Sequence, residues 1–204
     1  MNLSKTYAAI AALIAWAALI LQFRIFVFDP APPPAGVALA NYFSYFTILT
    51  NILVALALSA SALGKPDSFL NRPSVRAAIA VYIAVVAIVY HIILNSLWKP
   101  AGWYLVANIL LHYVTPALFW IDWVLFAPKR GLKFSMPLTW IIFPALYSVE
   151  ALARGALTDF YPYPFLDAGA LGYMRVFLNI AVMVCVFELA GAGVIALSRV
   201  LPDR

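Results

Sequence analysis

The sequence contains little charge. Only 10% of its 204 residues are Asp, Glu, Lys or Arg, whereas a typical soluble domain carries about a quarter. Hydrophobic residues make up 66% of the chain. This balance excludes a water-soluble globular domain and indicates an integral membrane protein. The length allows about six helices of ~20 residues with short loops, so we predict a single transmembrane domain over residues 1–204.

Cysteine and the common cofactor motifs are also scarce. The one cysteine, Cys185, lies in an apolar segment, and a lone cysteine forms neither an intrachain disulfide nor a thiolate metal site. The sequence has no Gly-rich phosphate loop and no CxxC pair. The net charge of +5 comes from basic residues that lie mostly in short loops between apolar segments, as membrane topology requires. We therefore predict no cofactor, no metal and no nucleic-acid partner.

Six apolar segments predict six membrane-spanning helices. Loops rich in Pro and Gly separate them, because neither residue continues a helix well. The segments are long and rich in Ala, Leu, Val and aromatic residues, which favours helices over the strands of a barrel. The predicted fold is thus an all-α bundle of six transmembrane helices. Their approximate bounds are 6–28, 41–63, 75–97, 104–126, 136–154 and 172–200.

Lys and Arg are divided unequally between alternating loops. If the N-terminus is inside, nine lie on the inner side, Arg204 among them, and four on the outer side. The excess predicts that both termini are cytoplasmic. Asp122 would then meet the inner basic loop 129–133. Five aromatic residues would lie at the outer interface, namely Trp98, Trp103, Tyr104, Tyr161 and Tyr163.

Polar residues interrupt the predicted spans on the outer side. They form i,i+4 pairs, and each pair shares one helix face. Lipid cannot form hydrogen bonds with these polar side chains, so the helix faces that carry them should point to the bundle interior or to a water-filled cavity. We therefore predict a polar cavity in the outer half of the membrane. The pairs are Thr47/Asn51, His91/Asn95, Asn108/His112, Glu150/Arg154 and Arg175/Asn179.

Both histidines of the chain lie in predicted spans, and three chemistries could use them. In the first, Thr47 or Thr50 is a nucleophile that His112 activates. In the second, His91 and His112 ligate a haem. In the third, both histidines and Glu150 bind a metal. The spacing of the residues does not distinguish between these three chemistries. A fourth hypothesis is a cavity that binds a lipid or another ligand without catalysis.

Three stretches carry a resemblance to a known family. "YFTILTN" at 45–51, "LLHYVTPALFWID" at 110–122 and "TDFYPYPFLDAGALGYMRVFLN" at 158–179 resemble the androgen-induced and androgen-dependent six-span membrane proteins. The animal members hydrolyse fatty acid esters of hydroxy fatty acids with an intramembrane Thr and a His. The chain looks like a member of a bacterial branch. The resemblance implies an intramembrane ester hydrolase in a bacterial plasma membrane, with Thr47 as nucleophile, His112 as its base and a lipid ester from the bilayer as substrate.

The remaining polar residues would support this pair. Asn108, one helical turn from His112, could orient its imidazole. Asn51 or Arg154 could stabilise the oxyanion, and Arg154 or Arg175 could bind a fatty carboxylate. The segment 161–167 could cap the cavity. We also expect candidate supporting roles for Thr50, His91 and Asn95, and candidate headgroup roles for Glu150 and Asn179.

Overall fold

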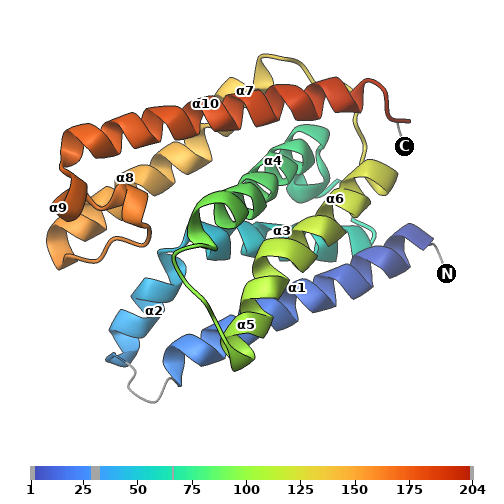
Figure 1. The fold of residues 1–204 in the computed structure, drawn as a ribbon. Coiled ribbons are helices and arrows are strands. Elements are labelled where there is room, and N and C mark those ends of the chain that lie inside the picture. The colour runs from blue at the N-terminus through green and yellow to red at the C-terminus, as the bar shows by residue number, and fades with distance from the viewer. Residues whose placement is uncertain (1–2, 29–32, 66, 203–204) are drawn as a thin grey trace.

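A computed structural model describes residues 3–28, 33–65 and 67–202, and these residues form an all-helical bundle (Figure 1). Arg204, which contributes to the predicted charge bias, lies outside them. Figure 1 shows that the start of α1 and the end of α10 lie at the same end of the bundle. The helices are α1 (Leu3–Val27), α2 (Ala35–Phe43), α3 (Phe46–Ala62), α4 (Pro73–Val89), α5 (Gly102–Ile109), α6 (Thr115–Phe126), α7 (Met136–Trp140), α8 (Ile142–Thr158), α9 (Ala168–Leu171) and α10 (Tyr173–Ser198).

Within the described ranges, five helices are long and apolar enough to cross a membrane, and the pair α2–α3 brings the number to six if it forms one bent span. These helices indicate a multi-pass integral membrane protein. The long spans agree with five of the six predicted segments to within a few residues. They are Leu3–Val27, Pro73–Leu94, Gly102–Phe126, Met136–Thr158 and Tyr173–Ser198.

The segment predicted as the span 41–63 is divided between the end of α2 and α3. The chain breaks after α2, and α3 leaves at 72°. Tyr45 has an extended backbone, which ends the helix. Backbone groups released by a break in an apolar bundle need new partners. The hydroxyl of Tyr147 on α8 supplies one by donating to the carbonyl of Ser44 at 3.0 Å.

Small residues allow the helices to approach closely. Ala8, Ala11, Ala15 and Ala18 of α1 are fully buried or nearly so, and α1 packs along α3. Small side chains are the usual means by which membrane helices gain contact area, because lipid provides little hydrophobic drive for association. α4 is the most buried of the long spans and contacts α3, α6 and α10.

A buried ion pair joins α4 to α6. Arg76 donates to the carboxylate of Asp122, and both side chains are almost completely buried. Arg76 also donates to the carbonyl of Ala57 at 3.3 Å and to Ser61 Oγ at 3.0 Å, both on α3. The sequence suggested the basic loop 129–133 as the partner of Asp122, and the structure gives Asp122 an ion pair with an arginine in the first turn of α4.

Candidate functional site

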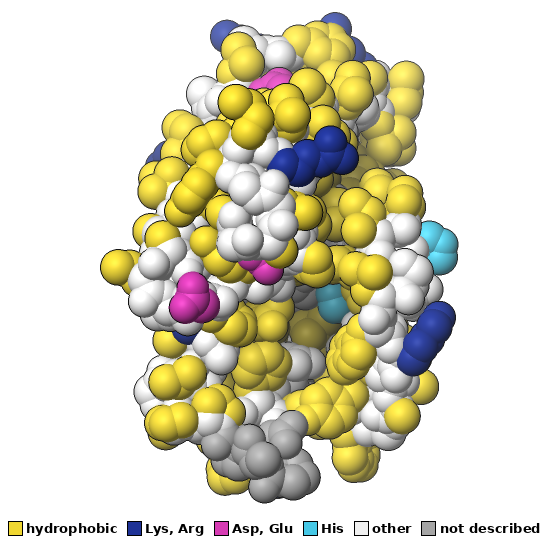
Figure 2. All heavy atoms as spheres, turned by 60° about the vertical axis from the view of Figure 1, so that its left-hand side comes forward, with side chains coloured by type: hydrophobic (Ala, Val, Ile, Leu, Met, Phe, Trp, Pro, Cys, Tyr) yellow, Lys and Arg dark blue, Asp and Glu magenta, His cyan; other side chains and the backbone are white. Residues whose placement is uncertain are grey.

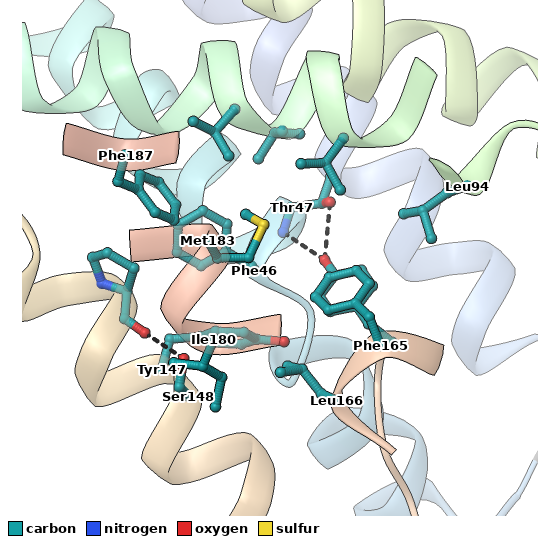
Figure 3. A pocket seen from close by; sticks show the side chains of 15 residues that line it. Phe46, Thr47, Leu94, Tyr147, Ser148, Phe165, Leu166, Ile180, Met183 and Phe187 are labelled. Carbon is teal, nitrogen blue, oxygen red and sulfur yellow. Dashed lines mark hydrogen bonds between the residues drawn. The ribbon is translucent and has the colours of Figure 1, made fainter. Parts of the chain in front are cut away.

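Thr47 lies directly after the break between α2 and α3. It is the second residue of α3, so its backbone N–H is one of the four at a helix start that have no intrahelical acceptor. The phenolic oxygen of Tyr163 accepts this N–H at 3.2 Å and lies 3.1 Å from Thr47 Oγ1. Figure 3 shows both contacts as dashed lines from Thr47. The break thus places the hydroxyl and the backbone N–H of one residue beside the phenol of Tyr163.

His112 is the second side chain that contacts the hydroxyl of Thr47. It lies in a π-helical turn, Leu110–Val114, that joins α5 to α6. Such turns are rare and frequently occur at functional sites. His112 Nδ1 is 3.0 Å from the carbonyl oxygen of Asn108, and Nε2 is 3.5 Å from Thr47 Oγ1. A carbonyl can only accept a hydrogen bond, so Nδ1 carries the proton and Nε2 presents its lone pair to the threonine.

A tyrosine holds the imidazole in place. The ring of Tyr90 stacks on His112 with the centroids 3.9 Å apart and the planes 25° from parallel. Tyr90 lies in a second π-helical turn, Tyr90–Leu94, which continues α4. Its hydroxyl accepts from the side-chain amide of Asn108 and donates to Asn95 Oδ1 at 3.4 Å. The backbone carbonyl of Asn108 therefore orients His112 directly. The side chain of Asn108 contributes indirectly, because it holds the Tyr90 ring that stacks on His112.

Two cavities meet at Thr47 and Tyr163. The larger has a volume of about 420 Å³ and also contains His112 and Asn108. Figure 2 shows a hollow between apolar side chains with a histidine inside it. The smaller has a volume of about 60 Å³ and lies between α4, α8 and α10. Both linings are mainly apolar and aromatic. Thr47 and Tyr163 are the polar residues that line both cavities.

Tyr163 was not among the site residues predicted from the sequence. It was expected at the membrane interface, but it is buried and lines both cavities. Burial raises the pKa of Tyr163 to about 12, so its hydroxyl stays protonated and can donate a hydrogen bond at neutral pH. One signal in the sequence pointed to a fixed position: Pro162 and Pro164 flank this tyrosine, and proline restricts the backbone.

The other predicted residues of α3 have different roles. Asn51 donates to the carbonyls of Thr47 and Leu111 at 2.8 and 3.2 Å. Both N–H groups of its amide are then occupied, which leaves no donor for an oxyanion. Thr50 is fully buried and lines neither of these two cavities. It is therefore a poor alternative to Thr47 as nucleophile.

The two histidines do not share a cavity. His91 is exposed, its Nδ1 lies 3.1 Å from the hydroxyl of Tyr113, and it lines neither cavity. Among the described residues, no group of three or more His, Cys, Asp and Glu side chains could hold a metal ion. These positions remove the geometric basis for a site shared by His91, His112 and Glu150.

The charged candidates lie away from Thr47. Arg154 donates to Asn41 Oδ1 at 2.6 Å and packs on the ring of Phe160. It lines a third cavity, which Thr47 and His112 do not line. Glu150 and Arg175 are exposed. None of these three lines either cavity at Thr47, so neither the oxyanion role of Arg154 nor a carboxylate-binding role at Thr47 has support from their positions.

The segment 161–167 borders both cavities. Pro162, Tyr163 and Pro164 line the larger one, and Phe165 and Leu166 line the smaller one together with Tyr163. Asn179 of α10 holds this segment by donating to the carbonyl of Phe165 at 2.8 Å. The amide that was expected to bind a headgroup is thus used to anchor the loop that carries Tyr163.

No protein-family model matches the chain, and no curated protein and no solved structure matches it.

Proposed function

We propose that this protein is an intramembrane hydrolase of lipid esters, with Thr47 as the nucleophile and His112 as the general base. One observation carries the proposal: His112 Nε2 lies 3.5 Å from Thr47 Oγ1 while Nδ1 is held by a backbone carbonyl. A nucleophile next to a base that a third group orients is the common arrangement of covalent catalysis. The resemblance of the motifs around both residues to the androgen-induced and androgen-dependent family supports the same pair.

The reaction has two halves. Thr47 Oγ1 attacks the ester carbonyl carbon while its proton passes to His112 Nε2. The carbon–oxygen bond to the alcohol then breaks, and His112 gives that proton to the leaving oxygen. Water attacks the acyl-threonine next, again losing its proton to His112. The carbon–oxygen bond to Thr47 breaks, Thr47 regains a proton from His112, and the free acid leaves.

The hydroxyl of Tyr163, beside the start of α3, would stabilise the oxyanion. Its oxygen accepts the Thr47 N–H and lies 3.1 Å from Thr47 Oγ1, which fixes the phenol beside the nucleophile. The N-terminus of a helix also carries a partial positive charge. Preorganised donors of this kind, in a site that excludes water, are usually the largest single contribution to catalysis of acyl transfer. The Tyr163 hydroxyl takes the role that the sequence analysis assigned to Asn51 or Arg154.

The lining of the larger cavity favours a lipid substrate. Most of it is apolar and aromatic, including Phe26, Leu97, Trp98 and Tyr104, and such surfaces bind hydrocarbon. We place the reaction in the outer half of a bacterial plasma membrane, with both termini in the cytoplasm, because basic residues are more numerous in the loops that would then be inside. The substrate would enter from the bilayer.

Turnover of esters by purified protein tests the proposal. Wild type, Thr47→Ala and His112→Ala, each in detergent, are assayed with p-nitrophenyl esters and with a branched fatty acid ester. We expect hydrolysis by wild type, loss of activity in both variants, and equal melting temperatures. Absence of hydrolysis by wild type at every acyl length, or activity that both substitutions leave intact, would overturn the proposal. Lipid that copurifies equally with wild type and Thr47→Ala would then identify a lipid-binding protein.

A further inference from the structure

The geometry points to a division of the substrate between the two cavities: we propose that the smaller cavity binds the acyl chain and the larger cavity binds the alcohol part. This inference rests on the proposed function. It adds the orientation of the ester and the class of substrate, namely an ester of a short-chain acid with a long or bulky lipid alcohol.

The position of His112 sets the orientation. The leaving alcohol oxygen must receive its proton from His112, so the alcohol part lies on the side of Thr47 where that imidazole lies. His112 lines the larger cavity and not the smaller one. The carbonyl oxygen is directed to the hydroxyl of Tyr163, which lies 3.1 Å from Thr47 Oγ1. The third substituent of the carbonyl carbon is the acyl chain, and the remaining space beside Thr47 is the smaller cavity.

The chemistry of the smaller cavity fits a hydrocarbon chain. Away from Thr47 and Tyr163 its lining holds two polar side chains, and both are already hydrogen-bonded within the protein. Tyr147 donates to the carbonyl of Ser44, and Ser148 Oγ donates to the carbonyl of Pro144 at 2.9 Å. Neither hydroxyl proton is free to donate to a ligand. Figure 3 shows Met183 and Phe187 on one side of Thr47, where an acyl chain would pass.

Size then limits the acyl chain. A cavity of about 60 Å³ has room for roughly four to six groups of the size of a water molecule, which corresponds to a short chain. The larger cavity, at about 420 Å³, has room for a much longer alcohol part. The two volumes therefore predict that the enzyme prefers a short acyl chain and accepts a long alcohol part in the same ester.

Two series of esters test this assignment. In one series the acyl chain grows from acetyl to palmitoyl on a fixed alcohol, and in the other the alcohol grows on a fixed acetyl group. For wild type we expect kcat/KM to rise about fourfold per added acyl methylene, the effect of burying one such group, and to fall beyond roughly six carbons. Lengthening the alcohol should not produce an optimum at so short a chain.

Two variants change the cavity in opposite directions. Met183→Ala enlarges it and should move the acyl optimum to chains longer by two or three carbons, about one Met side chain in length. Ile180→Phe fills it and should select against all but the shortest acyl chains. The control is Met174→Ala, which changes an exposed methionine of the same helix. Neither cavity variant should change the alcohol profile.

The outcomes separate this inference from the proposed function. Hydrolysis that Thr47→Ala abolishes, with an acyl profile that neither cavity variant changes, overturns the division of the substrate and leaves the hydrolase standing. A change of the alcohol profile by Met183→Ala overturns the orientation. Absence of hydrolysis of every ester, or hydrolysis that survives Thr47→Ala, overturns both.

Discussion

Two clusters of polar side chains are buried in this apolar bundle, and they differ in what surrounds them. One joins Arg76 to Asp122, packed between α3, α4 and α6, and neither residue lines a cavity described above. The other joins Thr47, His112 and Tyr163 on the walls of two cavities. The first pairs opposite charges. The second holds neutral groups and directs a base, a hydroxyl and a donor toward space that a ligand can fill.

The contrast shows that burial of polar groups in a membrane bundle does not by itself identify a functional site. A buried ion pair can be purely structural, since removal of one partner leaves a costly unpaired charge. A functional site needs reactive side chains on the wall of a cavity. Other residues, which do not occupy the cavity, must hold those side chains in the correct orientation. His112 meets this condition because the Asn108 carbonyl and the Tyr90 ring hold it from behind. Each prediction below acts on one cluster and leaves the other intact.

The largest effect is expected for the nucleophile and its base. Thr47→Ala and His112→Ala should each lower kcat by at least about 10³-fold, because each removes a group that takes part in bond formation or proton transfer. The chain provides matched controls in Thr50→Ala and His91→Ala, which change residues of the same type outside both cavities. Steady-state hydrolysis of a chromogenic ester measures all four. Equal losses in Thr50→Ala and Thr47→Ala would contradict the assignment.

The ion pair should affect stability and not catalysis. Arg76→Met should lower the free energy of unfolding by about 3–5 kcal/mol, because it leaves the Asp122 charge buried and unpaired. The double variant Arg76→Met/Asp122→Leu should recover most of that loss. Thermal unfolding in detergent gives the stability, and kcat per folded molecule should stay within about twofold of wild type. A single variant as stable as wild type would show that the pair is not structural.

Loss of one oxyanion donor should have an intermediate effect. Tyr163→Phe removes the hydroxyl 3.1 Å from Thr47 Oγ1 and should lower kcat about 10²-fold with little change in KM, since the donor acts mainly in the transition state. Tyr161→Phe is the control, because Tyr161 lies in the same loop and lines neither cavity. Kinetics over a range of ester concentrations separates kcat from KM. A change confined to KM would make Tyr163 a binding residue only.

The smallest effect is expected at Asn108. Asn108→Ala keeps the backbone carbonyl that accepts from His112 Nδ1 and removes only the amide that donates to the hydroxyl of Tyr90. The loss of one neutral hydrogen bond, about 1 kcal/mol, corresponds to about fivefold in kcat. The same ester assay measures it. A loss as large as that of His112→Ala would mean that the side chain, and not the carbonyl, orients the imidazole.

The pattern of the sequence predicted much of the architecture. Six apolar segments follow from composition alone, and five agree with the helices of the structure to within a few residues. The sequence also predicted that Thr47 and His112 lie at the same end of the bundle, because each is near the start of its span and the second and fourth predicted spans run in the same direction. The motifs around both residues pointed to the same pair, which the structure brings within 3.5 Å.

The remaining features depend on partners far away in the chain. Hydropathy does not detect the break at Tyr45, because Tyr147, more than a hundred residues later, satisfies the released carbonyl of Ser44. The acceptor of His112 is a backbone carbonyl, a group that every residue has, so the sequence carries no mark of it. Tyr163 reaches Thr47 through a long-range contact of a loop residue. Arg76 finds Asp122 only after α4 and α6 pack together.

Detection of an acyl-threonine tests the central proposal most directly. Wild type, Thr50→Ala and Thr47→Ala are treated with a fluorophosphonate or a slowly released ester, and peptides are then examined by mass spectrometry. We predict an adduct on Thr47 in wild type and in Thr50→Ala, and none on any residue in Thr47→Ala. Hydrolysis without an adduct on Thr47, or an adduct that persists in Thr47→Ala, would contradict a threonine nucleophile.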